Sequence, residues 1–162
     1  MPSFDVVSEV NTQEVDNAVN QARKELITRF DLKDSKATIE LTEPNVIELR
    51  AEEIGKLRSL VEILIGKLAK RNIDLRNVDR KEAAISPLGH ARQEIRIKQG
   101  LESEKAKEII KAIKGFNAKM QSQIQDRQVR VTGKKKDELQ AVIQFLRGTD
   151  FGVGIYFKNF RE

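Results

Sequence analysis

The sequence predicts an α+β protein built from two copies of one unit, and three observations support this. Short runs of alternating apolar and polar residues, typical of half-buried strands, flank longer segments with apolar residues at helical spacing. The order strand, helix, strand, strand, helix, strand occurs twice, and apolar positions of the two copies match at a constant offset. A duplicated βαββαβ pattern predicts tandem ferredoxin-like sandwiches, each a four-stranded antiparallel sheet covered on one face by two helices.

The first half contains each element of this order in turn. Alternation over residues 4–7 predicts a strand, and an apolar stripe over residues 15–26 predicts a helix. The segment ATIELTEPNVIELR, with a Pro-Asn turn between two alternating runs, predicts a hairpin. A second stripe over residues 54–68 predicts a long helix, and IDLRNVD supplies the last strand.

The second half repeats the order. We expect a strand at residues 95–97, a helix at 106–113, a hairpin over 124–131, a helix at 139–146 and a last strand in VGIYFKNF. The register between the halves rests on five apolar matches: Ile47, Leu49, Leu57, Val61 and Leu64 correspond to Val129, Val131, Leu139, Ile143 and Leu146.

These patterns predict the domain boundaries. The first unit spans residues 1–81 and the second spans residues 91–162. Residues 82–90 form the join, because Pro87 and Gly89 interrupt regular structure there. A different connection, in which the units exchange a terminal strand, would leave the same sequence pattern and stays open.

The composition excludes several classes of function. The chain has no cysteine and one histidine, His90, so disulfides, thiolate nucleophiles and zinc clusters are excluded, and we expect His90 in a surface loop. The beginning MPSFDVVSEV lacks the features of a signal peptide, and no apolar run is long enough to span a membrane. We therefore expect a cytoplasmic protein without a membrane partner, a metal or a cofactor.

The positive charge is concentrated in the second half of the chain. Residues 1–80 carry 13 Lys/Arg and 15 Asp/Glu, a net charge of −2, whereas residues 81–162 carry 17 and 10, a net charge of +7. If the protein binds nucleic acid, we expect the second unit to bind it.

Two glycine-containing turns carry the basic candidate residues. The turn VTGKKKDE contains Gly133, Lys134 and Lys135, and the turn KQGLES contains Lys98 and Gly100. We expect the first and third strands to be parallel neighbours, which would bring both turns to one edge beside two helix N-termini, where an anion is favoured. The corresponding first-half turns, SEVNTQE and LRAEE, are acidic, so the fold does not require lysines there.

The turn VTGKKKDE is not a P-loop. The pattern GxxxxGK[ST] requires a glycine where Gln128 stands and a Ser or Thr where Lys135 stands. Walker-type hydrolysis is therefore not expected. The turn either contacts a phosphate or is a solvated corner, and the sequence leaves both open.

The face of the second sheet opposite its helices is predicted to be basic, with one aromatic side chain. Alternation places these residues on it: Glu94, Arg96, Lys98, Arg130, Thr132, Tyr156 and Lys158. RNA-recognition modules stack bases on aromatic residues of the first and third strands, which here have none. Tyr156 either stacks one base or lies at an interface between the units.

Several blocks of the sequence also carry a family resemblance. MPSFDVVSEV, TRFDL, KQGLES, QIQDRQVRVTGKKKDELQAVI and FKNFRE together resemble the YajQ family of bacterial proteins, over essentially the whole chain. This resemblance implies tandem ferredoxin-like domains similar to RNA-recognition modules, a role in binding nucleotides or nucleic acid and, in some relatives, sensing of cyclic di-GMP.

These observations favour a non-enzymatic protein that binds a nucleotide such as GTP, or an RNA such as tRNA. The expected ligand contacts come from the basic turns and the open face: Arg96, Lys98, Gly100, Arg130, Gly133, Lys134, Lys135, Tyr156 and Lys158. The alternative is a cyclic di-GMP receptor that acts through a protein partner. An enzyme using carboxylates is a third class, but no local pattern supports it.

Overall fold

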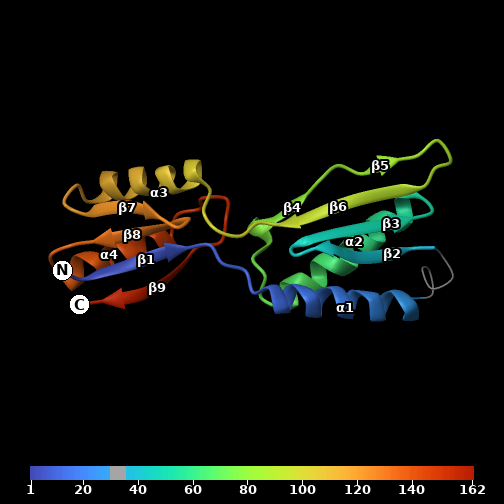
Figure 1. The fold of residues 1–162 in the computed structure, drawn as a ribbon, viewed down its shortest axis with the longest axis horizontal. Helices are drawn as coiled ribbons and strands as arrows, with labels where there is room; N and C mark the ends of the chain where they lie inside the picture. The colour runs from blue at the N-terminus through green and yellow to red at the C-terminus, as the bar shows by residue number, and fades with distance from the viewer. Residues whose placement is uncertain (30–35) are drawn as a thin grey trace. The chain divides into compact units, whose positions relative to one another are not determined.

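The computed structural model describes residues 1–29 and 36–162 (Figure 1). The end of the TRFDL block lies outside these residues. Between β1 and β6, the first strand of the second half, lie the elements α1 to β5. The elements are β1 (Ser3–Val7), α1 (Thr12–Thr28), β2 (Thr38–Glu43), β3 (Val46–Ala51), α2 (Ile54–Lys70), a 3-10 helix (Leu75–Asn77), β4 (Val78–Arg80), β5 (Ala84–Ile85), β6 (Ala91–Ile97), α3 (Ser103–Phe116), β7 (Gln121–Gln125), β8 (Gln128–Thr132), α4 (Lys136–Arg147) and β9 (Tyr156–Arg161).

The strands form two sheets, and each has the strand order of a ferredoxin-like sandwich. Sheet A has the order β7-β8-β1-β9, and sheet B has the order β2-β3-β6-β4, with β5 also paired to β6. The helices α3 and α4 pack on sheet A, and α1 and α2 pack on sheet B (Figure 1). The predicted fold class, two βαββαβ sandwiches, is therefore confirmed, including the exchange of strands that the sequence left open.

The exchange changes the domain boundaries. One unit consists of Met1–Glu9 and Gln99–Glu162, and the other is Val10–Lys98. This division differs from the expected one, with units 1–81 and 91–162, because β1 pairs with β8 and β9 of the second half, while β6 takes the matching place beside β3. The expected join, residues 82–90, lies inside the second of these units and contains β5.

The expected charge difference between the units disappears with the new boundaries. The unit formed by residues 1–9 and 99–162 carries 13 Lys/Arg and 10 Asp/Glu, a net charge of +3. Residues 10–98 carry 17 and 15, a net charge of +2. Residues 81–98, with 4 Lys/Arg and 2 Asp/Glu, belong to the unit of sheet B, and residues 1–9, with Asp5 and Glu9, belong to the unit of sheet A.

Each unit has its own core, and the matched apolar residues of the two sequence halves lie in these cores. All ten residues of the five apolar matches are buried, on the helix-covered sides of the two sheets. Asn11 caps α1 as its type predicts: its side-chain oxygen accepts from the backbone N–H of Gln13, at 3.0 Å. In IDLRNVD a 3-10 helix precedes the short β4, so only part of that segment is a strand.

Candidate functional site

The residues expected to form one basic site belong to two different units. Arg96 and Lys98 belong to the unit of sheet B, where Arg96 lies on β6 and Lys98 follows it. The other expected residues belong to the unit of sheet A: Gly100, Arg130, Gly133, Lys134, Lys135, Tyr156 and Lys158. The open face that was expected to join Arg96 to Arg130 is therefore two faces on two sheets.

The two glycine turns also lie apart within sheet A. The expectation of parallel central strands is wrong, since β1 and β8 pair antiparallel, with Ser3 opposite Thr132. Gly133 therefore lies beside the beginning of β1, where its N–H donates to the Pro2 carbonyl oxygen at 3.2 Å. Gly100 lies beyond the other end of β1, and its N–H donates to the Ser8 carbonyl oxygen.

Both glycines have structural reasons for their positions. Gly100 has φ +80°, and a Cβ there would lie 3.0 Å from the Arg127 side chain. A Cβ on Gly133 would lie 2.8 Å from the Cε of Met120, a buried side chain. Since their N–H groups are also engaged, neither turn presents a glycine amide to a phosphate. The side chains of Lys134 and Lys135 remain exposed.

On sheet A, the basic side chains of the open face are paired with acids. Asp5 is buried at the centre of this face, where Arg130 donates to it at 3.0 Å and Asn159 at 2.8 Å. Burial alone would raise the pKa of Asp5, but the hydrogen bonds from Arg130 and Asn159, with the charge of Arg161, hold it below its ordinary value. Lys158 pairs with Glu9. This face is therefore largely neutralised.

The aromatic residues of β9 differ in exposure. Tyr156 is 45% exposed and lies opposite Val7 at the edge of sheet A, which leaves its ring accessible. Phe157 packs partly buried on the core, whereas Phe160 is 59% exposed.

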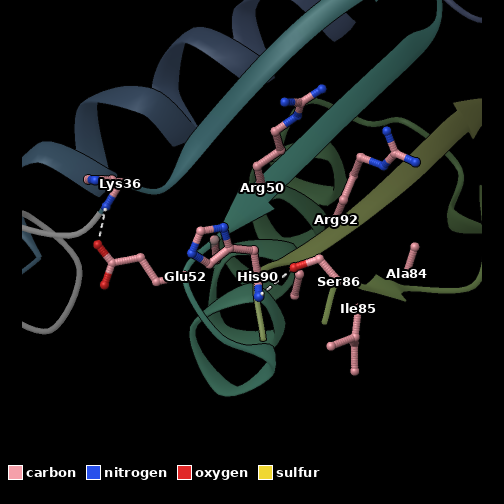
Figure 2. Close-up of a pocket in the computed structure, with 10 residues that line it drawn as sticks. Lys36, Arg50, Glu52, Ala84, Ile85, Ser86, His90 and Arg92 are labelled. Carbon is pink, nitrogen blue, oxygen red and sulfur yellow. Dashed lines mark hydrogen bonds between the residues drawn. The ribbon is translucent and has the colours of Figure 1, made fainter. Parts of the chain in front are cut away.

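A pocket in the other unit collects basic side chains that were not predicted as a group (Figure 2). It has a volume of about 580 Å³ and lies where β3 ends and β6 begins. Its charged or titratable lining residues are Lys36, Arg50, Glu52, His90 and Arg92, and its remaining lining residues are Ala51, Ala84, Ile85, Ser86 and Ala91.

The pairing of β3 with β6 brings the two arginines together. Arg50 and Arg92 face each other directly across these antiparallel strands, so their Cβ atoms lie on the same face at about 5 Å. Figure 2 shows the two side chains extending side by side from the two strands. Both are exposed, because they alternate with buried Leu49, Ala51 and Ala91.

The wall of the pocket is an ordered turn after β5. The Ser86 N–H donates to the His90 carbonyl oxygen at 2.8 Å, and the His90 N–H donates to the Ser86 hydroxyl oxygen at 3.2 Å. Gly89 allows this turn through its φ of +89°. His90 is exposed, as expected of a surface loop residue, but it also lines the pocket.

The pocket has more positive than negative charge. Arg50 pairs with Glu48. Among residues 1–29 and 36–162, Arg92 makes no close ion pair, although its charge interacts with Glu94, two positions along β6. Glu52 accepts a hydrogen bond from the backbone N–H of Lys36 at 3.2 Å. Two facing arginines are unfavourable without a counter-charge, and a bound anion would supply one.

This pocket was not predicted, because LRAEE has the composition of an acidic turn. The available signal was the pair of similar segments LRAE and HARQ, each with an arginine next to an inward-facing alanine at a strand end. Only the pairing of β3 with β6 makes those arginines neighbours.

The fold and the pocket together define the class of protein: two ferredoxin-like units, one of them with a cationic pocket suited to an anionic ligand. Where the structure describes the chain, no group of three or more His, Asp or Glu residues could hold a metal ion, and no helix is long and apolar enough to cross a membrane.

Comparison with known proteins identifies the family. The family model described as "Nucleotide-binding protein YajQ-like" matches residues 2–161. Proteins named as nucleotide-binding proteins from Trichlorobacter lovleyi, Bordetella avium and Marinomonas are 48%, 49% and 46% identical to this chain, with full coverage of both sequences in each case. The chain belongs to the YajQ-like family, as the blocks of the sequence predicted.

Proposed function

We propose that the protein binds a nucleotide through the pocket of Lys36, Arg50, His90 and Arg92, without catalysing its turnover. The observation that carries this proposal is the pair of facing arginines, of which Arg92 makes no close ion pair among the described residues. Arginine side chains bind phosphate with two parallel hydrogen bonds, so two adjacent arginines can hold one phosphate group. The names of the relatives support a nucleotide as the ligand.

The rest of the pocket suits the remaining parts of a nucleotide. Ala84 and Ile85, both exposed, provide an apolar surface for a base or a sugar, and a volume of about 580 Å³ is in the range of small-molecule sites. Glu52 and His90 are polar groups that can bind hydroxyl or base nitrogen atoms. We also propose that the protein acts in the cytoplasm, where nucleotides are abundant.

RNA and cyclic di-GMP are two more specific candidates for the ligand. An RNA would use additional phosphate contacts, and the exposed Lys134 and Lys135 at the beginning of α4 are available for them. Tyr156 is exposed and can stack one base. A cyclic di-GMP receptor acting through a protein partner would place one of its phosphates on the same two arginines.

A titration at several salt concentrations distinguishes these ligands. We propose to measure the binding of GTP, cyclic di-GMP and tRNA side by side. A small ligand held in the pocket should show a shallow dependence of affinity on salt, whereas a long polyanion releases many counterions and should show a steep one.

Replacement of Arg50 and Arg92 by alanine tests the pocket. We expect binding of the preferred nucleotide to fall at least tenfold, because charge-assisted hydrogen bonds contribute about 1.5–3 kcal/mol each. The matched control is Arg58→Ala with Lys70→Ala, which removes the same charge from exposed positions of α2 in the same unit. An equal loss in both double variants would show that net charge, and not the pocket, determines binding.

A further inference from the structure

The four outer edges of the two sheets differ in how they are protected from pairing with another strand. An exposed edge presents unpaired backbone groups, and proteins usually protect it with charges, proline, bulges or very short strands. Sheet A ends in β7 and β9, and sheet B ends in β2 and in the short β4 and β5.

Three of these edges carry such protection. The register of β9 shifts opposite β1, where Asn159 has φ +57°, and the strand contains Lys158 and Arg161. The register of β2 also shifts, and its carbonyl at Ile39 accepts a hydrogen bond from Arg23 at 2.6 Å. The strands β4 and β5 have three and two residues, and two of the three in β4 are charged.

The strand β7 has none of these devices. Its sequence QSQIQ contains no charge and no proline, and its pairing with β8 runs without a register shift over all five residues. Four of its five side chains are exposed, including Ile124 at 44%. The strand is therefore the unprotected edge among those that the structure describes.

The sequence of β7 can face a second copy of itself without opposing charges. In an antiparallel pair with a two-fold axis at Gln123, Gln121 faces Gln125 of the second copy and Ser122 faces Ile124. No charges oppose each other within these five positions. Amide side chains can donate to and accept from one another across such a pair.

We propose that the β7 edge pairs antiparallel with the β7 edge of a second copy of this chain, which extends sheet A across a two-fold axis. A pair of five-residue strands buries less surface than a stable dimer interface, so the association is weak and depends on concentration. It is independent of the proposed nucleotide pocket, which lies in the other unit.

Charge substitution at Gln123 tests this proposal by sedimentation velocity from micromolar to millimolar concentrations. The wild-type protein should approach twofold its monomer mass at the upper end. Gln123→Lys and Gln123→Glu should each stay monomeric, because like charges would face each other at the axis, and an equimolar mixture of the two should recover the association. Circular dichroism of each variant checks that the fold is intact.

Gln140→Lys, at an exposed position of α4 in the same unit, is the matched control and should associate like the wild type. A wild-type protein that stays monomeric at millimolar concentration would overturn the proposal. So would a Gln123→Lys variant that associates normally, since another surface would then be responsible, or a mixture that fails to recover association.

Discussion

At the scale of single residues, the arginines of the strands differ in the charge of the side chains beside them. Arg130 and Arg96 have neighbouring acids, Asp5 and Glu94, and their charges are largely satisfied within the fold. Arg92 faces Arg50 instead. A residue that costs stability in the free protein but suits an anion is characteristic of a binding site, where stability is given up for function.

Arg92→Thr should therefore stabilise the free protein while weakening nucleotide binding. Removing one of two facing like charges should raise the free energy of unfolding by about 0.2–1 kcal/mol, and threonine suits a strand position. Urea unfolding with and without nucleotide measures both effects. A variant that is less stable without ligand, yet binds normally, would contradict the proposed role of the arginine pair.

Asp5 gives a prediction about pH. Its lowered pKa means that its contribution to stability is present above the unfolded-state pKa of about 3.9 and is lost as the pH falls through the lower folded-state value. Asp5→Asn should cost about 1–3 kcal/mol at neutral pH, because hydrogen bonds to a buried charge are lost. Urea unfolding measures this cost. The difference in unfolding free energy between Asp5→Asn and the wild type should be smaller at about pH 2 than at neutral pH.

The control for Asp5 is Glu94→Gln. The pKa of Glu94 is also lowered, chiefly by its hydrogen bond from Arg96, but the pair lies on the surface. Its removal should change stability little at either pH. If the two substitutions had equal effects, burial of Asp5 would not be the cause.

At the scale of elements, the turn before α4 contains glycine and lysine but does not bind phosphate through its backbone as a P-loop would. Gly133 is required by the approach of Met120, and its amide is bound to Pro2. Of the lysines that follow, Lys136 pairs with Glu162, whereas Lys134 and Lys135 are exposed. Such side chains suit the contacts of a polyanion better than the fixed geometry of one nucleotide.

Replacing Lys134 and Lys135 by glutamate should thus weaken tRNA binding and leave GTP binding nearly unchanged. The salt slope for tRNA should fall by roughly one unit per lost phosphate contact. Lys111→Glu with Lys114→Glu, at exposed positions of α3 in the same unit, is the matched control. Equal weakening of tRNA binding by both double variants would show that the turn makes no specific phosphate contact and is only a solvated corner.

The helices and strands were largely predictable from the sequence, but the sheet that each strand joins was not. The stripes of α1, α2, α3 and α4 and the alternation of β3 and β8 follow from which side chains must be buried. Alternation shows that a strand is half-buried, but not against which sheet. Since β1 and β6 occupy equivalent positions, the pattern fits either assignment, and the pocket at Arg50 and Arg92 depends on that assignment.

At the scale of the whole molecule, the exchange makes each unit depend on both halves of the chain. Sheet A is built from β1 together with β7, β8 and β9, and sheet B receives β6 between β3 and β4. Phe4 and Val6 are fully buried in the core formed by the C-terminal half. Ile95 is fully buried in the core of the other unit. The two halves of the sequence are therefore joined by strand pairing as well as by the chain.

Cleavage of the backbone in the exposed turn between β5 and β6 tests this arrangement. A specific protease site inserted between Leu88 and Gly89 would leave β1 on one fragment and β6, β7, β8 and β9 on the other. After cleavage the fragments should stay together through gel filtration in native buffer, because separation would expose the cores at Phe4 and Ile95, and they should separate in urea. If the units were instead formed by residues 1–81 and 91–162, the same cleavage would release two folded fragments without denaturant.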